Sequence, residues 1–394
     1  MTAPRPLPTP PASPPAAEPP ANGLPPVARL SELLASPTDR RRFLTRAAAL
    51  GVTLPSAGAL LGCETREHDG TAARSRGTAG TAGAAGTAGG QDQGHEAHQP
   101  GGRSNDDAAP AGVRPPDYKV YDAALPPVAP GSRVRIEMVA RELPVHLTRD
   151  LVVPAWTFDG TIPGPVVHVR VGQTVEFTLR NEGQVPHSMD FHAAQIDPKQ
   201  AFAPVLPGKS ISYTFTPRYP GAFLYHCGTQ PVLMHIGSGM YGAIIVDPVR
   251  PLPKAREFVL VQSEFYIGKD ESGAPRMDYQ KMLDELPDHV AFNGIPNQYQ
   301  DAPLVVRKGE RVRFYVVNAG PSHPCSFHVV GEQFDTVYLG APPGNPIHGV
   351  QTFMVAPGGG MIFELECDVA GDFPFVNHGF GHGQKGAIGV LRVQ

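Results

Sequence analysis

Short runs of alternating apolar and polar residues, separated by turns rich in proline and glycine, fill the chain from Tyr118 onward. Residues 174–179 alternate strictly, so every second side chain of this expected strand lies on one face. Residues 212–215 and 223–226 continue the pattern, and a helical period is visible only over 278–286. Many short strands between turns are typical of a β-sandwich or a β-barrel.

The pattern occurs twice along the chain. Residues 171–181 align with residues 307–318, and each copy leads into two histidines five residues apart. These histidines are His187 and His192 in the first copy, and His323 and His328 in the second. Two copies of one Greek-key β-domain, meeting near residue 250, explain this repeat. We therefore predict an all-β fold, with one domain over 116–250 and a second over 251–394.

The composition differs before this region. The chain contains 44 Gly and 45 Pro residues, and much of this excess precedes residue 116. Residues 1–38 are rich in Pro and Ala, which predicts disorder. Residues 64–115 consist mainly of Gly, Ala, Thr and polar residues, and this composition predicts a flexible linker.

An export signal is predicted within residues 1–63. Consecutive arginines at 40–42 precede an apolar stretch over 47–61 that is too short to span a bilayer. This order is typical of a twin-arginine signal. The signal ends in a lipobox-like sequence whose last residue is Cys63, a candidate lipid anchor. We expect an exported protein, either periplasmic or anchored to a membrane and facing the periplasm or the exterior.

Charge and cysteine content exclude several classes of protein. A formal net charge of −4 provides no basic surface for nucleic acid or anionic lipid. Four cysteines in 394 residues do not form a disulfide framework, so each thiol needs its own explanation. Cys325 and Cys367 are left as core thiols or as a disulfide pair, and the apolar alternation before Cys367 favours core packing.

One set of residues has the composition of a blue-copper site. Two imidazoles, a thiolate and a thioether are the donors that such an electron-transfer site uses, with Met as the weak axial ligand. The set comprises His187, Cys227, His235 and Met240. It lies on an early strand and on a later strand and loop, and it predicts a bound copper ion.

A second set adjoins the first. His226 directly precedes Cys227, and neighbours in an extended strand point to opposite faces. A second metal on His226, with His192 nearby, would therefore be joined to the first by one covalent path through the two adjacent residues. Such a path suits an enzyme that relays electrons better than it suits a simple carrier.

Residues 126–393 resemble the copper-containing nitrite reductases. The resemblance implies two tandem cupredoxin-like Greek-key β-sandwich domains, with a type 1 copper on the four residues above. It also implies a type 2 copper on three histidines, His192 and His226 of one subunit and His378 of its neighbour. The implied reaction is the one-electron reduction of nitrite to nitric oxide by a homotrimer, with a small cupredoxin or cytochrome c as electron donor.

Further residues match the family by position. Asp190 and His328 match its proton-handling carboxylate and imidazole, and Val330 falls where an aliphatic residue shapes the substrate pocket. The loop from Cys227 to His235 resembles that of a shorter-loop subclass that includes outer-membrane lipoproteins. This agrees with the lipobox-like sequence.

The chain departs from the family pattern after His378, where it is rich in glycine. His382 lies in this segment, and two interpretations of it stay open: an additional ligand, or a residue that lines the pocket. The second domain has no cysteine beside His378, so His323 is interpreted as a vestige of a second blue site.

Two alternative functions are also compatible with a copper-binding β-sandwich protein. A laccase-like two-domain oxidase uses paired His-x-His motifs for its trinuclear cluster, and this sequence contains none. A non-catalytic cupredoxin that only carries electrons would leave Asp190, His192, His226 and His328 without a role.

Overall fold

The computed structural model describes residues 117–394. The predicted export signal, Cys63 and the linker at 64–115 lie outside the described residues. No helix within 117–394 is long and apolar enough to cross a membrane.

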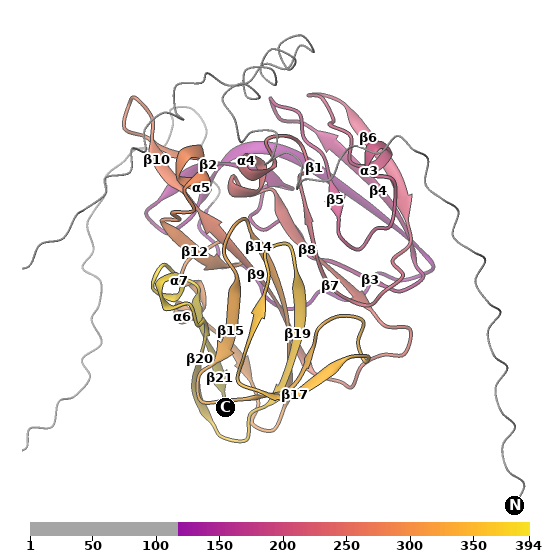
Figure 1. The fold of residues 1–394 in the computed structure, drawn as a ribbon, viewed down its shortest axis with the longest axis vertical. Helices are drawn as coiled ribbons and strands as arrows, with labels where there is room; N and C mark the ends of the chain where they lie inside the picture. Colours follow the sequence, from indigo (N-terminus) through magenta and orange to yellow (C-terminus); the bar gives the residue numbers. More distant parts are fainter. Residues whose placement is uncertain (1–116) are drawn as a thin grey trace, which may run out of the picture. The chain divides into compact units, whose positions relative to one another are not determined.

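The strands up to Asp247 form two four-stranded sheets (Figure 1). One sheet has the order β2-β1-β4-β6 and the other has the order β3-β8-β7-β5. The strands are β1 Arg133–His146, β2 Val152–Phe158, β3 Val167–Arg170, β4 Thr174–Asn181, β5 Asp190–Phe191, β6 Ser210–Phe215, β7 Gly221–His226 and β8 Tyr241–Asp247. Two short helices, α3 Pro198–Ala201 and α4 Val232–Gly237, lie in the connections.

The strands from Arg256 onward form a six-stranded sheet, β12-β9-β14-β19-β16-β17, and a five-stranded sheet, β13-β21-β20-β15-β18. Their bounds are β9 Arg256–Phe265, β12 His289–Phe292, β13 Ala302–Val306, β14 Arg311–Gly320, β15 Cys325–Val329, β16 Phe334–Tyr338, β17 Pro346–Val350, β18 Thr352–Val355, β19 Gly360–Glu366, β20 Gly371–Asn377 and β21 Ile388–Val393. The remaining elements are the hairpin β10 Ile267–Lys269 and β11 Pro275–Met277, and the helices α5 Tyr279–Leu283, α6 Gln298–Asp301 and α7 Phe380–Gln384. The described residues confirm the predicted all-β fold.

The alternation over 174–179 is the pattern of β4. Val175, Phe177 and Leu179 are each at most 1% exposed, and they pack into the core between the first two sheets. The Phe177 ring meets the Phe191 ring edge-on at 4.9 Å between centroids. The apolar side chains of β4 therefore all point to one face of the sheet, where they are buried away from water.

Strands β8 and β14 are buried on both faces. In β8, Ile244 and Val246 belong to the core of the first sheet pair, whereas Ala243 and Ile245 belong to a third core. That third core also takes Val317 and other residues of β14, and so it joins the two halves of the described chain. Burial on both faces explains why residues 243–246 of β8 and 314–317 of β14 are continuous apolar runs rather than alternating ones.

The cysteines of the second half are free thiols. Cys325 and Cys367 are both buried and neither forms a disulfide. Both lie in the apolar core of the second sheet pair, and burial raises the pKa of each thiol. Of the two interpretations left open by the sequence, core packing is the one observed.

Candidate functional site

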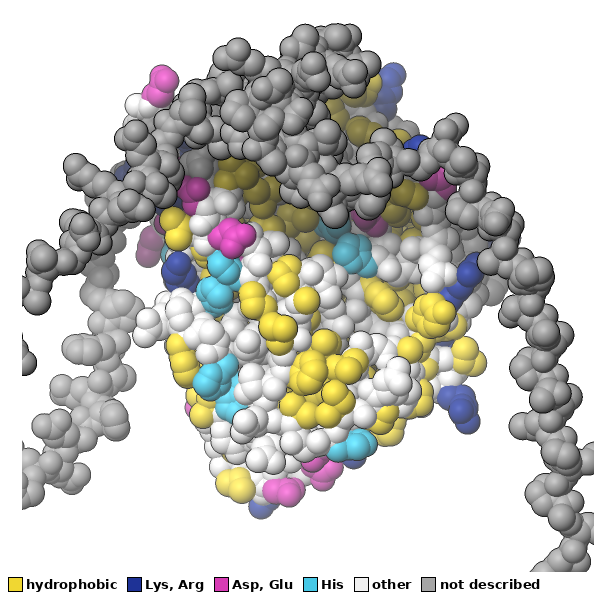
Figure 2. All heavy atoms as spheres, viewed as in Figure 1, with side chains coloured by type: hydrophobic (Ala, Val, Ile, Leu, Met, Phe, Trp, Pro, Cys, Tyr) yellow, Lys and Arg dark blue, Asp and Glu magenta, His cyan; other side chains and the backbone are white. Residues whose placement is uncertain are grey.

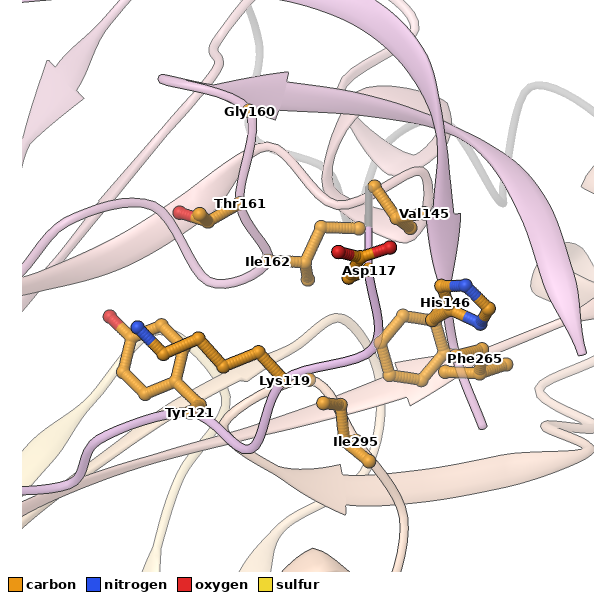
Figure 3. Close-up of a pocket in the computed structure, with 12 residues that line it drawn as sticks. Asp117, Lys119, Tyr121, Val145, His146, Gly160, Thr161, Ile162, Phe265 and Ile295 are labelled. Atoms are coloured by element: carbon orange, nitrogen blue, oxygen red, sulfur yellow. The ribbon is translucent and has the colours of Figure 1, made fainter. Parts of the chain in front are cut away.

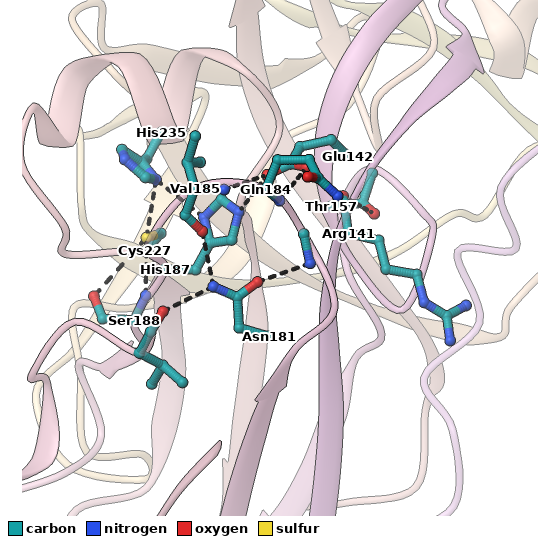
Figure 4. Close-up of polar contacts among 12 residues, drawn as sticks. Arg141, Glu142, Thr157, Asn181, Gln184, Val185, His187, Ser188, Cys227 and His235 are labelled. Carbon is teal, nitrogen blue, oxygen red and sulfur yellow. Dashed lines mark hydrogen bonds and ion pairs between the residues drawn. The ribbon is translucent and has the colours of Figure 1, made fainter. Parts of the chain in front are cut away.

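A buried cluster of one thiol and two imidazoles lies at the end of β7 (Figure 4). Cys227 Sγ is 3.2 Å from His235 Nδ1, and His187 Nδ1 is 3.3 Å from the same nitrogen. The ligand atoms of the three residues all lie within 4.8 Å of one another. Because soft thiolate and imidazole donors converge on one point, the cluster has the chemistry of a copper or zinc site.

Strand pairing and a short helix bring these residues together. Cys227 directly follows β7, and its N–H donates to the Met240 carbonyl at 3.1 Å. His235 lies in the last turn of α4, and its carbonyl accepts from the Met240 N–H at 3.1 Å. Met240 is 0% exposed. The backbone thus holds the predicted thioether ligand beside both Cys227 and His235.

Hydrogen bonds orient two members of the cluster. His187 Nε2 lies 3.1 Å from Glu142 Oε1, so that Nδ1 is the nitrogen that faces the cluster. The Ser188 N–H donates to Cys227 Sγ at 3.3 Å, which stabilises negative charge on the sulfur. A carboxylate behind a histidine fixes the orientation of its ring and raises its basicity as a ligand.

Both histidines of the buried cluster are held in the neutral form. Burial is the largest cause that lowers the pKa of His187, and Glu142 opposes it. Burial likewise lowers the pKa of His235 to about 4, with a further contribution from His187. A histidine must be neutral to ligate a metal, so both rings are ready to do so near neutral pH.

The sequence did not identify Glu142 or Trp156 as parts of this site. The Trp156 ring meets the rings of His187 and His235 edge-on, at 5.6 and 4.7 Å between centroids. Glu142 reaches His187 because β1 leaves β4 after Ala140 and continues in pairing with β2. No local motif signals either contact, since both depend on how distant strands pair.

A second cluster lies on β5 and the end of β7. His192 Nε2 is 3.1 Å from His226 Nε2, and Asp190 Oδ2 is 3.9 Å from the same His226 nitrogen. Asp190 faces His226 directly in the register of β5 and β7. His192 is exposed, whereas Asp190 and His226 are half-buried. This group is thus accessible to small solutes, unlike the buried cluster.

The outer nitrogens of the second cluster are held by backbone carbonyls. His192 Nδ1 lies 2.9 Å from the Gly358 carbonyl, and His226 Nδ1 lies 2.9 Å from the Cys227 carbonyl. A carbonyl oxygen only accepts, so each Nδ1 carries the proton and each Nε2 offers its lone pair. Both lone pairs converge where a metal ion could bind.

His226 and Cys227 join the two clusters. They are consecutive in the chain, yet Cys227 belongs to the buried group and His226 to the accessible group. This is the geometry expected from opposite faces of an extended strand. The shortest covalent route between the two groups is therefore a single pair of adjacent residues.

His328 and His378 lie together in the second half. Their ring centroids are 5.4 Å apart, on β15 and just beyond β20. Both line a cavity, and His328 Nδ1 is 2.6 Å from the Gln351 carbonyl. Val330 directly follows β15 and is 42% exposed. Among residues 117–394, no potential metal-binding group unites His378 with His192 and His226 in one chain.

A separate cavity of about 240 Å³ contains none of the predicted ligands (Figure 3). Its lining is largely apolar, with Val145, Ile162, Phe265 and Ile295 around it. Its one histidine, His146, has Nδ1 3.2 Å from the Thr148 carbonyl. Asp117 and Lys119 also line this cavity, and none of the potential metal-binding groups within residues 117–394 includes His146.

Comparisons with known proteins agree with this chemistry. Residues 142–251 match the family model described as multicopper oxidase. The copper-containing nitrite reductase of Neisseria gonorrhoeae is 40% identical over 272 residues, which cover 67% of this chain and 69% of that relative. The solved copper nitrite reductase from Nitrosomonas europaea is 39% identical, with a TM-score of 0.62, and the match covers 66% of this chain and 94% of that chain.

A solved multicopper oxidase is also similar, with 26% identity and a TM-score of 0.60 over 69% of this chain and 94% of that one. The two TM-scores are close, so the fold alone does not separate the two groups. Sequence identity does separate them, because it is clearly higher to the nitrite reductases. The chain belongs to the family of copper-containing nitrite reductases.

Proposed function

We propose that this protein reduces nitrite to nitric oxide, at a type 2 copper that receives electrons from a type 1 copper. Nitrite takes up one electron and two protons, one N–O bond breaks, and nitric oxide and water are released. The observation that carries the proposal is the direct link between Cys227 of the buried cluster and His226 of the accessible cluster. The names of the relatives support nitrite as the substrate.

His187, Cys227, His235 and Met240 are the residues that would hold the type 1 copper. Two imidazoles, a thiolate and a buried thioether match the donors of an electron-transfer copper. When bound, this copper supplies reversible one-electron chemistry, and a copper on three imidazoles supplies an open position for an anion. The chain contributes burial and the fixed orientation of the His187 ring.

Glu142→Ala should lower the affinity of the type 1 site for copper by about 10- to 100-fold, because His187 loses the carboxylate that orients it. Competition with a copper chelator, followed by the visible absorption of the site, measures the change. Glu182→Ala is the matched control, since within residues 117–394 the ion pairs of Glu182 are with the exposed Arg141 and Arg180 and with no ligand of the cluster. Equal copper affinity in the two variants would show that the Glu142 contact is dispensable.

The type 2 copper would be held by His192 and His226, completed by His378 of the partner subunit. Two imidazoles with converging Nε2 atoms form an incomplete site within one chain. His378 lies in the second half beside His328, in a cavity that opens to solvent. In a closed ring of identical contacts, the His192 and His226 pair of one subunit can meet His378 of the partner subunit. We propose a homotrimer with one shared site at each contact.

Exposed apolar side chains around His378 support a contact with a second copy. Phe380 is 58% exposed and its ring lies 4.6 Å from that of His378. Met354 is 55% exposed and pairs with Ser326 of the same cavity, and Val330 is 42% exposed. Figure 2 shows apolar side chains gathered on the face viewed, with histidines among and beside them. A second copy that covers these side chains would remove them from water.

Asp190 and His328 would handle the two protons. Asp190 lies 3.9 Å from His226 Nε2, beside the place where an anion would sit, so its carboxyl can pass a proton to a nitrite oxygen. His328 of the partner subunit would face the same anion from the other half-site, with its ring oriented by the Gln351 carbonyl. Val330, two residues further on, would limit the space available to the anion.

Asp190→Asn should reduce nitrite turnover by about 10²- to 10⁴-fold, the usual contribution of a positioned general acid, while both coppers remain bound. Turnover is measured as nitric oxide formation, and copper per chain is measured on the same sample. Asp197→Asn is the control, because Asp197 accepts from the Lys199 N–H at the start of α3 and faces no ligand histidine. Full turnover in Asp190→Asn would remove this residue from the mechanism.

The two alternative functions differ from this proposal in simple measurements. A laccase-like oxidase would consume oxygen with an organic reductant. A carrier that uses only the blue site would bind one copper per chain. The carrier would leave the accessible group of Asp190, His192 and His226 without a role.

We also propose export by the twin-arginine signal and anchoring through Cys63, which place the enzyme in the periplasm or on a membrane facing it. The support is the sequence of residues 1–63. A small cupredoxin or cytochrome c would then supply the electrons.

A further inference from the structure

His323 and His382 form an imidazole pair that the proposed reaction does not use. Their ring centroids lie 4.7 Å apart, with 44° between the ring planes. The corresponding separations are 5.3 Å for His187 and His235, and 5.1 Å for His192 and His226. The pair is therefore as close as the pairs that converge on the two candidate copper sites.

The loop that carries His323 is the structural counterpart of the loop that carries His187. Asn181 Nδ2 donates to two backbone carbonyls of the first half, at 2.8 and 2.7 Å. Asn318 Nδ2 donates in the same way in the second half, at 2.9 and 3.0 Å, and one of its acceptors is the His323 carbonyl. The same anchoring asparagine thus precedes both histidines.

A glutamate accompanies each loop. Glu142 lies two residues after the β1 residue that pairs with Asn181, and Glu264 lies two residues after the β9 residue that pairs with Asn318. Each carboxylate accepts from two backbone N–H groups of its loop; for Glu264 one donor is the His323 N–H, at 2.7 Å. The backbone anchoring of the loop is therefore repeated in the second half, whereas the ring contact is not, because His187 Nε2 faces Glu142 and His323 Nε2 faces the Glu285 carbonyl.

The contacts of the two rings leave the same nitrogen, Nδ1, with a lone pair that can bind a metal. His323 Nε2 lies 2.9 Å from the Glu285 carbonyl, which only accepts, so His323 Nδ1 keeps its lone pair. His382 Nδ1 lies 3.4 Å from Asn377 Nδ2, whose two hydrogens are already donated to Gln262 Oε1 at 2.8 Å and to the Pro324 carbonyl at 3.0 Å, so the lone pair of His382 Nδ1 is not held by this amide. The orientation of that amide is fixed, because Asn377 Oδ1 accepts from the Gly379 N–H at 3.0 Å. His187 and His235 also face their cluster through Nδ1.

A glycine replaces the thiol of the first half. Asp190 and Ser326 occupy matching positions, three residues after His187 and His323. Asp190 pairs with His226, and the Ser326 carbonyl accepts from the His378 N–H at 2.7 Å, so His226 and His378 are equivalent. Cys227 and Gly379 directly follow these two histidines and are therefore equivalent as well. A Cβ atom on Gly379 would lie 3.3 Å from His382 Nδ1. The site in the second half thus keeps two imidazoles, lacks the thiolate and cannot give a blue copper.

We propose that His323 and His382 bind a Cu(II) ion through their Nδ1 atoms, with solvent completing the coordination. Both side chains are half-buried, which gives solvent access to the remaining positions. Two protein ligands bind more weakly than three or four, so this site fills after the other two and loses its ion first to a chelator. Among divalent first-row ions, Cu(II) has the highest affinity for imidazole donors. The proposal does not depend on nitrite reduction.

The test uses the full chain with its type 1 and type 2 coppers in place. The dialysed holoprotein is exposed to Cu(II) of a different isotope, and the newly bound copper is measured by mass spectrometry. Wild type should take up one more equivalent than His323→Ala, His382→Ala or His382→Gln. His348→Ala is the control and should match wild type, because His348 is an exposed histidine whose Nδ1 contacts, in the part of the chain that the structure describes, Thr336 and the Asp335 carbonyl and no second histidine.

Two readouts keep the result unambiguous. An unchanged blue band in each variant shows that the fold is intact, and the isosteric Gln variant avoids a cavity. The electron paramagnetic resonance spectrum of the added Cu(II) should show two coordinated nitrogens in wild type and lose that signature in the variants. Equal copper uptake by wild type and by all three variants would overturn the proposal, since the extra ion would then bind elsewhere on the chain.

Discussion

Replacing Cys227 with alanine should abolish the intense visible absorption of the copper-loaded protein and reduce nitrite turnover to background. Cys227 provides the thiol of the group that includes His187 and His235, and the Met240 thioether cannot replace it, so charge transfer from thiolate to copper has no other source within this group. In our proposal its peptide link to His226 is also the route for the electron. The type 2 copper should largely remain, because the ligands proposed for it lie in a different cluster.

Visible absorption, copper per chain and nitric oxide formation are measured on one preparation. Cys325→Ala is the matched control, since Cys325 is also a free, fully buried thiol but lies in the core of the second half. The control should keep both the band and the activity. A visible band that survives in Cys227→Ala would mean that the type 1 assignment is wrong.

His378→Ala should lose type 2 copper and nitrite turnover yet keep the full blue band. Within one chain, His192 and His226 offer only two imidazoles, and the third ligand in our proposal comes from the partner subunit. Loss of one of three ligands leaves an incomplete site. The buried cluster is untouched, because His378 lies with His328 in the second half.

Copper analysis should find about one copper per chain in His378→Ala and two in the His348→Ala control. Sedimentation should show that wild type is a trimer and that dissociation releases type 2 copper together with activity. A fully active monomer with two coppers per chain would contradict a site shared between subunits.

The parts of the fold and site that the sequence predicted depend on local patterns. The burial of Val175, Phe177 and Leu179 follows from the strict alternation of β4. Cys227 and His235 are predictable because they lie close together in the chain. Cys227 directly follows β7, and His235 lies in the short helix α4 that comes next. The opposite orientation of His226 and Cys227 follows from the geometry of an extended chain.

The parts that the sequence did not predict depend on how distant strands pair. Glu142 reaches His187 only because β1 runs past the end of β4 and continues beside β2. The contact between His323 and His382 requires the end of β14 and the helix after β20 to meet. The sequence left His382 as a ligand or a pocket residue, because spacing along the chain does not reveal this pairing.

The most direct test of the central claim is anaerobic incubation of the copper-loaded protein with isotopically labelled nitrite and a chemical electron donor, with the gas phase followed by mass spectrometry. The proposal predicts labelled nitric oxide in a ratio of one per electron consumed, at a rate that Cys227→Ala and His378→Ala both reduce to background. In a separate aerobic incubation of the same preparation with the same electron donor, oxygen uptake should stay negligible. Rapid oxygen consumption without labelled nitric oxide would contradict the proposal and favour an oxidase.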